Sequence, residues 1–181
     1  MPNFWNNFDK QSLIPTYWFN KSNDLWRSAR ILWEAINNKE SGAAFCGAQY
    51  LMLMGMSIEA LIKAHCVAQK LEDKDIAHSH DLTKLAKIAG LKMQKDENNI
   101  LTILTGYVTW EGRYPTPKRE AQFNHHNKTY NQVAINQSKI GELIVEYHND
   151  QLDFDNIHKI WSRLSDDYLT KYNETPDGHW L

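Results

Sequence analysis

The chain has 181 residues, of which 42% are hydrophobic, and this length and composition suit one domain with a substantial core. Its formal net charge of −2 excludes a globally basic nucleic-acid binder, so a polyanion would need a local excess of positive charge. Such an excess lies in residues 113–128, where four basic residues accompany one acidic residue. A solvated loop is the alternative interpretation of that segment.

The two cysteines, Cys46 and Cys66, would lie roughly 30 Å apart on a single helix, which is beyond the reach of a disulfide. We therefore expect reduced thiols and a cytoplasmic protein. The first ten residues lack the basic and apolar regions of a secretory signal. The most apolar stretch, residues 50–62, is interrupted by Ser57 and Glu59 and is too short to span a bilayer, so no membrane association is expected.

The first half of the chain predicts two long helices. Residues 1–21 are aromatic and irregular, and we expect them to pack onto the rest of the chain as an arm. Ser22 can cap a helix over residues 23–38, which carries an apolar stripe at Leu25, Ala29, Leu32 and Ile36. A second helix over residues 41–70 is apolar nearly all round, which predicts the central and most buried helix of the fold.

Two shorter helices are expected next. Asp81 is a good N-cap for a helix that Gly90 terminates. Asp96 is expected to cap the following helix, which ends by Gly112.

The remaining sequence is less regular. Pro115 and Pro117 predict a loop over residues 113–129, followed by a weaker helix over residues 131–147. A last helix begins at Asp153 or Asp155, and no alternation typical of strands is evident.

Three short motifs follow one another in the middle of the chain. Glu59 and Lys63 are four residues apart in the long helix, His80-Asp81-Leu82 begins the next helix, and Tyr107 precedes Arg113-Tyr114-Pro115. In their order and spacing these motifs resemble the HEPN family of prokaryotic helical bundles, over about residues 25–170.

The resemblance implies an all-α fold, a four- to five-helix up-and-down bundle over residues 22–173, with residues 1–21 as an aromatic N-terminal arm and residues 174–181 as a C-terminal tail. It also implies a homodimer that binds RNA or a nucleotide. The setting that it implies is a toxin–antitoxin module or phage defence, with a nucleotidyltransferase or an antitoxin as partner.

Nuclease members of that family use an Arg and a His, four to six residues apart and contributed by two subunits, to cleave RNA without metal. Arg119 and His125 have this spacing. Cleavage needs a base for the 2′-hydroxyl proton and a cation for the phosphate, which His125 and Arg119 would supply, with Lys118 as a further phosphate contact. A basic loop without chemistry is the alternative.

The other candidate residues each allow two interpretations. Glu59 and Lys63 can form a structural ion pair or line a cleft. Arg113 and Tyr114 can contact a phosphate and a base. Alternatively they can form a structural corner, in which Arg113 binds the helix carbonyls and Tyr114 is buried.

His78, His80 and Asp81, with His65 or Cys66 as a further ligand, could ligate a metal, but no familiar ligand spacing supports this, so no metal or other cofactor is expected. We therefore predict RNA or nucleotide binding through the motif and basic residues, namely Arg113, Tyr114, Lys118, Glu59, Lys63, His80, Asp81 and Tyr107. The alternatives are a metal-independent endoribonuclease that uses Arg119 and His125, and a helical protein-interaction module without a nucleic-acid role.

Overall fold

The computed structural model describes residues 11–71 and 74–172. Its elements in chain order are α2 (Pro15–Asn37), the 3-10 turn η1 (Ala43–Phe45), α3 (Gly47–Ala68), α4 (Lys74–His78), α5 (Leu82–Ile88), α6 (Lys95–Gly106), the π-helical turn η2 (Tyr107–Glu111), α7 (Glu120–Ala134), β1 (Ile135–Ile140), β2 (Leu143–His148) and α8 (Phe154–Tyr172). The fold is thus mostly helical, as predicted, with one small two-stranded sheet.

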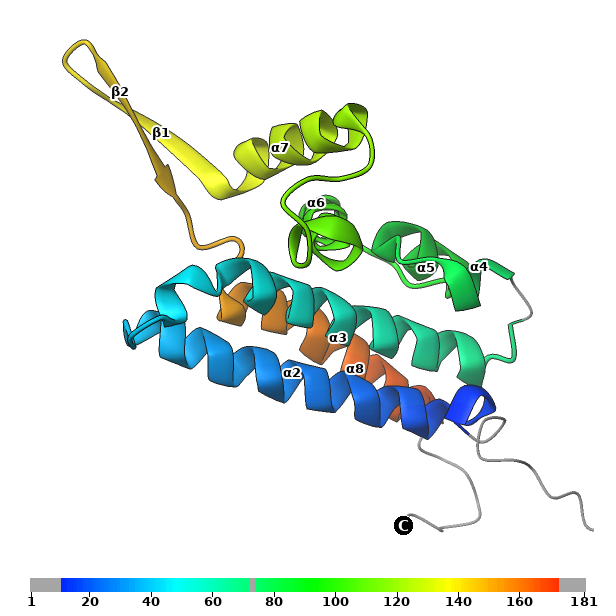
Figure 1. Cartoon of the computed structure of the whole chain (residues 1–181). Coiled ribbons are helices and arrows are strands. Elements are labelled where there is room, and N and C mark those ends of the chain that lie inside the picture. The colour runs from blue at the N-terminus through cyan, green and yellow to red at the C-terminus, as the bar shows by residue number, and fades with distance from the viewer. Residues whose placement is uncertain (1–10, 72–73, 173–181) are drawn as a thin grey trace, which may run out of the picture.

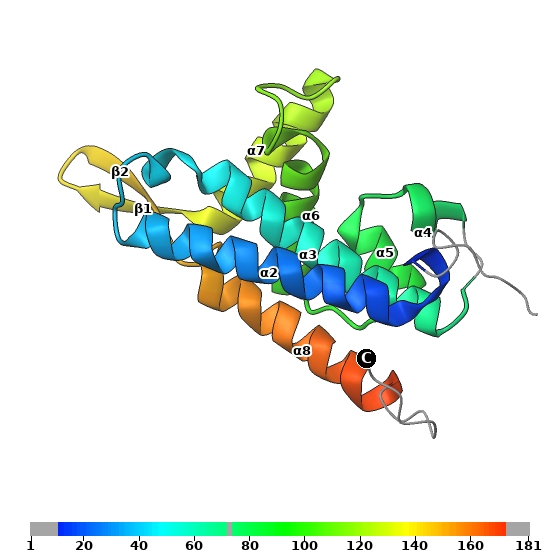
Figure 2. The same ribbon diagram turned by 60° about the horizontal axis from the view of Figure 1, so that its bottom comes forward.

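The long helices α2, α3 and α8 lie side by side and form the base of the molecule (Figures 1 and 2). Helices α5 and α6 and the turn η2 pack on α3 from the other side, and α7 packs on α6. Helix α3 therefore packs against α2, α5, α6, η2 and α8, which agrees with its predicted central position.

Helix α3 is buried over most of its length because its side chains are apolar on nearly all faces. Its 22 residues would be long and apolar enough to cross a membrane, but most of that surface is buried against other helices, as in the core helix of a soluble protein. The two thiols lie at its start and inside it, Cys46 at the N-cap and Cys66 in the buried part.

Helix α2 begins at Pro15, seven residues before the predicted cap Ser22, because proline is well tolerated in the first turn of a helix. Ser22 is instead buried in the middle of α2. Its hydroxyl lies 2.8 Å from the Ser57 carbonyl oxygen, to which it donates, and the Ser57 hydroxyl donates back to the Ser22 carbonyl at 2.8 Å. These small side chains hold α2 and α3 together. The predicted arm is therefore helical from Pro15 onward, and its first ten residues and the predicted tail lie outside the described residues.

The predicted ends of α5 are confirmed. The Asp81 side chain accepts a hydrogen bond from the backbone N–H of Lys84, which makes Asp81 the N-cap. Gly90 follows the helix with a φ of +67°, a left-handed conformation that glycine adopts without strain. The predicted cap of α6 was wrong by two residues, because Gln94 and Glu97 form a capping box and Asp96 lies inside the first turn.

The prediction for residues 113–148 was wrong in two respects. The loop ends at Arg119, and residues 120–134 form α7 rather than the loop and the start of a weak helix. Residues 135–148 form an antiparallel hairpin, which projects from the helical body (Figure 1). Its two-residue turn contains Gly141 with a φ of +63°, a conformation that favours a tight hairpin turn.

Candidate functional site

A buried contact between η2 and α7 sets the position of the candidate site. Oε2 of Glu111 lies 2.5 Å from Nε2 of His126, whose side chain is 5% exposed. The His126 ring packs edge-on against Tyr107 and Trp110, and it lies so close to the backbone of Gly106 that a Cβ there would overlap the imidazole. Glycine is therefore required at position 106 for α7 to approach α6.

The buried tyrosines beside this contact are held in the neutral form. Burial, reinforced by the nearby Glu111 carboxylate, raises the pKa of Tyr107 and that of Tyr130 above the usual range of tyrosine. Neither tyrosine therefore supplies a phenolate near neutral pH, and both serve to pack the helices around the site.

The first cavity beside the contact of η2 with α7, which we call the polar pocket, has a volume of about 310 Å³. It lies between the start of α5, the C-terminal half of α6 with η2, and the start of α7. Its lining is mostly polar: Asp81, Thr83, Thr102, Thr105, Gly106, Thr109, Trp110, Gln122, His125 and His126.

A second cavity, which we call the proline pocket, adjoins the first and has a volume of about 470 Å³. Thr109, Trp110 and Gln122 belong to both cavities and form the wall between them. The rest of its lining comes from the segment before α7: Tyr114, Pro115, Thr116, Pro117 and Lys118. The two pockets are adjacent, and we refer to them together as the groove. The ring of Tyr114 and the cation of Lys118 lie in the proline pocket, and most of the polar groups lie in the polar pocket.

The two residues predicted to be catalytic lie at the head of α7. Arg119 is the exposed N-cap residue, and His125 is exposed and lines the polar pocket. Six positions along a helix correspond to a rotation of roughly 600°, so the two side chains leave the axis roughly 120° apart. Arg119 does not line either pocket, whereas its neighbour Lys118 lines the proline pocket.

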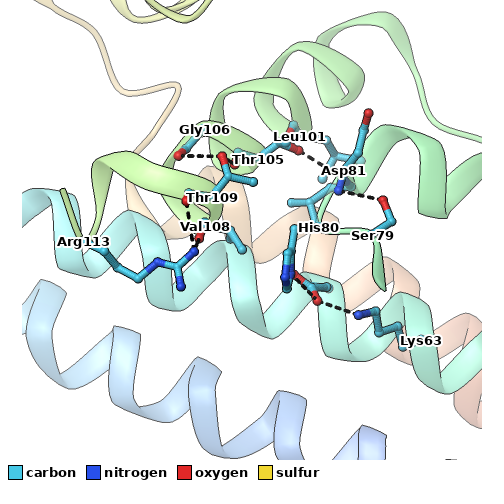
Figure 3. Close-up of polar contacts among 12 residues, drawn as sticks. Lys63, Ser79, His80, Asp81, Leu101, Thr105, Gly106, Val108, Thr109 and Arg113 are labelled. Carbon is cyan, nitrogen blue, oxygen red and sulfur yellow. Dashed lines mark hydrogen bonds and ion pairs between the residues drawn. The ribbon is translucent and has the colours of Figure 1, made fainter. Parts of the chain in front are cut away.

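Three of the predicted binding residues form a separate cluster between α3, which carries Glu59 and Lys63, and His80 in the segment before α5 (Figure 3). Nζ of Lys63 lies 2.8 Å from Oε1 of Glu59, and Nδ1 of His80 lies 3.0 Å from Oε2 of the same carboxylate. The side chains of Lys63 and Glu59 are only 4% and 12% exposed, and Lys63 also lies over the ring of Trp18. This arrangement matches the structural interpretation of the pair. Within α3 the two ions pair with each other, and they also connect α3 to Trp18 of α2 and to His80, whereas neither lines the groove.

Arg113 is directed toward the end of the helix. Its guanidinium donates to the carbonyl oxygens of Val108 at 2.7 Å and Thr109 at 3.0 Å (Figure 3). This is the predicted structural corner, in which a cation satisfies the last carbonyls of a helix. The corner prediction was wrong for Tyr114, because its side chain is 59% exposed and lines the proline pocket.

The groove also contains residues that the sequence did not single out, above all Trp110, Gln122 and the threonines of α6 and η2. For the threonines a sequence signal existed, because Thr102, Thr105 and Thr109 are three and four residues apart and so share one face of a helix. A π-helical turn such as η2 is rare and occurs often at functional sites.

The described residues contain no group of three or more His, Cys, Asp or Glu side chains that could hold a metal ion. Comparison with protein-family models, with curated proteins and with solved structures finds no match for this chain.

Proposed function

We propose that this protein binds single-stranded RNA or a nucleotide in the groove formed by the polar and proline pockets. The observation that carries the proposal is that Trp110, Tyr114 and Lys118 line the groove, which also includes Asp81 and His125. The exposed ring of Tyr114 can stack on a base, and Lys118 can contact a phosphate without regard to sequence. Part of the groove, including Lys118, comes from residues 113–128, the segment of excess positive charge noted in the sequence.

The test is binding of a fluorescent single-stranded RNA hexamer, followed by anisotropy. Affinity should fall as salt rises from about 50 mM to about 200 mM, because phosphate contacts release counterions. Replacing Lys118 and Arg119 together by alanine should weaken binding at least about tenfold, and Tyr114→Ala should weaken it through lost stacking, which is worth roughly 1–3 kcal/mol per base.

A matched control removes the same charge elsewhere. Lys92 and Lys95 are exposed and lie before and at the start of α6, away from the groove. Their double replacement by alanine should leave affinity nearly unchanged. Equal losses in the two double variants would indicate nonspecific attraction to total charge and would contradict the proposed site.

A metal-independent endoribonuclease is the second candidate. The observation that favours it is the position of the Arg119–His125 pair, because Arg119 immediately precedes α7 and His125 faces the polar pocket. In this mechanism His125 accepts the 2′-hydroxyl proton and Arg119 stabilises the charge that develops on the phosphate. Since Arg119 lies outside the lining of the pockets, a second subunit would have to complete the site.

The two candidates differ in the role of His125. An enzyme should lose cleavage in Arg119→Ala and in His125→Ala while it retains RNA binding, and its cleavage should persist in EDTA. A binding protein should leave the RNA intact, and His125→Ala should retain most of its affinity. Intact RNA after long incubation with wild-type protein at high concentration would exclude the enzyme.

We propose, from the order of the motifs, that the chain is a HEPN-like bundle that acts as a cytoplasmic homodimer. The setting proposed is a toxin–antitoxin module or phage defence, with a nucleotidyltransferase or an antitoxin as partner. If RNA does not bind even at low salt, a helical protein-interaction module becomes the better hypothesis. The exposed apolar side chains of the hairpin favour that alternative.

A further inference from the structure

Three threonine hydroxyls of the polar pocket donate their protons to the backbone of their own helix. A threonine hydroxyl has a single proton to donate. Thr102 donates it to the carbonyl of Asn98 at 2.9 Å, Thr105 to that of Leu101 at 2.8 Å, and Thr109 to that of Thr105 at 2.7 Å. Toward a ligand these three hydroxyls can therefore only accept, and that of Thr105 already accepts from the Leu82 N–H at 3.0 Å.

The side of the pocket formed by Asp81 also presents hydrogen-bond acceptors. The Thr83 hydroxyl donates to Oδ1 of Asp81 at 2.7 Å, and the N–H of Lys84 donates to the same oxygen at 3.0 Å. Both of these hydrogen bonds are accepted by Oδ1 of the carboxylate. A carboxylate accepts only, so Asp81 adds a charged acceptor to the wall.

Three other lining groups can donate. The indole N–H of Trp110 donates only. The Gln122 amide and the His125 imidazole can each donate or accept, according to their orientation or tautomer. Among the groups of fixed direction, the acceptors of the three threonines and Asp81 thus outnumber the single donor of Trp110, and one of these acceptors is negatively charged. A phosphate has acceptor oxygens and negative charge, so it is repelled from this wall, whereas a group rich in N–H donors is favoured.

We propose that the polar pocket binds the edge of a nucleobase that carries an exocyclic amino group, with that group directed toward Asp81. This inference rests on the proposed function. Adenine and cytosine have an amino donor at the position where hypoxanthine and uracil have a carbonyl acceptor. The pocket, at about 310 Å³, lies at the small end of ligand sites, which are roughly 300–1,000 Å³.

The proline pocket then has the complementary role. Lys118 provides the cation for the phosphate, and the exposed ring of Tyr114 provides a stacking surface. The shared wall of Thr109, Trp110 and Gln122 separates the two sites, so the ribose of the selected nucleotide lies across it. The phosphate thereby remains outside the acceptor-lined cavity.

The test compares RNA hexamers in which an exocyclic amino group is replaced by a carbonyl and the adjacent ring nitrogen changes from an acceptor to an N–H donor. Hexamers of adenosine and inosine form one pair, and hexamers of cytidine and uridine form the other. Wild-type protein should bind the amino member of each pair at least about tenfold more tightly, because a carbonyl in place of the amino group leaves an acceptor facing Asp81. Equal affinity within both pairs would overturn the inference.

The variant Asp81→Asn tests the assigned residue. Asparagine is as good an N-cap as aspartate, so α5 should be retained, which a thermal melt can verify. Its amide can also donate, so the preference for adenosine over inosine should fall to less than about threefold. The control Asp96→Asn removes an equivalent carboxylate from the exposed first turn of α6 and should leave the preference unchanged.

The two proposals can fail separately. If no hexamer binds at low salt, the proposed function is wrong and this inference falls with it. If the hexamers bind with salt dependence but without preference within the pairs, the groove binds RNA and only the base-edge assignment is wrong. A preference that persists unchanged in Asp81→Asn would also contradict the assignment, because another group would then carry it.

Discussion

Glu111 and His126 are joined through Oε2 and Nε2 at 2.5 Å, and this buried contact links the π-helical turn η2 to α7. Because Glu111 lies in the widened turn and His126 lies beside His125, the contact fixes the rotation of α7 about its own axis. That rotation places His125 and Gln122 in the polar pocket. The site therefore depends on a pair of residues that makes no proposed contact with the ligand.

The first prediction concerns the close approach of α6 and α7. Gly106→Ala should lower the free energy of unfolding by about 1–3 kcal/mol, because the new methyl group would overlap the His126 ring. The control is Gly47→Ala at the start of α3, where a Cβ meets no atom within 4 Å, so stability should be kept or slightly raised. Urea unfolding measures both. A Gly106→Ala variant as stable as the wild type would show that α7 does not hold this position.

The second prediction concerns the core. Leu61 is fully buried on α3, so Leu61→Ala should lower the free energy of unfolding by about 2–5 kcal/mol. Met56 on the same helix is 38% exposed, and Met56→Ala should cost clearly less. Amide exchange should be slowest in α3, because its opening requires global unfolding. Fast exchange across residues 47–61 would contradict the central position of this helix.

The third prediction concerns pH. Burial lowers the pKa of His65 below its ordinary value of 6.5, although a hydrogen bond to the Leu164 carbonyl and the nearby Asp167 oppose the shift. Above pH 6.5 the imidazole is neutral in the folded and the unfolded chain. Below it the unfolded chain binds the proton more readily, so the free energy of unfolding should fall as pH falls.

The variant His65→Gln isolates this effect, since glutamine can still donate to the Leu164 carbonyl. Between about pH 7.5 and about pH 5.5, urea unfolding of the variant should lose less stability than that of the wild type. His78 is exposed, and His78→Gln should leave the slope of the wild type unchanged. Equal slopes for wild type and His65→Gln would mean that His65 accepts a proton in the folded state without penalty.

The fourth prediction concerns association. The cross-strand pairs of the hairpin place six uncharged residues on one face, Asn136, Ser138, Ile140, Leu143, Val145 and Tyr147, and its four largest side chains are 40–70% exposed. An isolated two-stranded hairpin is only marginally stable in water, so a covered face would stabilise it. A face without charge can meet its own copy across a twofold axis without like-charge repulsion.

Sedimentation equilibrium should accordingly detect a dimer that Leu143→Lys dissociates. Gln137→Lys introduces the same charge on the opposite face of the hairpin and should leave the dimer intact. A monomeric wild type, or a dimer insensitive to Leu143→Lys, would contradict association through this face.

The fifth prediction concerns metal. Protein purified without added metal should contain no stoichiometric zinc, because His80 is bound to the Glu59 carboxylate that also pairs with Lys63, a cation that competes with any metal. Elemental analysis provides the measurement. Bound zinc that disappears in His80→Ala would show that the prediction is wrong.

The sequence alone determined the helical class and the central helix. Residues 43–62 are apolar on nearly all faces, and such a pattern is stable only when it is covered on all sides. Local signals were also sufficient at Asp81 and Gly90, because an N-cap and a left-handed C-terminal residue act within one turn of the helix.

The region after Gly112 required tertiary information. Helix α7 was overlooked because its buried stripe includes His126, which appears polar in the sequence and is buried only by its contact with Glu111. The hairpin had a signal in its β-branched residues and in Gly141, but its strands alternate weakly and are paired only with each other.

The candidate site shows the same division. Sequence motifs identified Asp81, Lys118 and His125, but they grouped them with Glu59, Lys63 and His80, which lie in a different cluster. Spacing along a chain fixes which residues share a helix face, whereas the packing of α7 against α6 and η2 decides which faces meet. The groove exists because Gly106 permits that packing and the Glu111–His126 contact holds it in place.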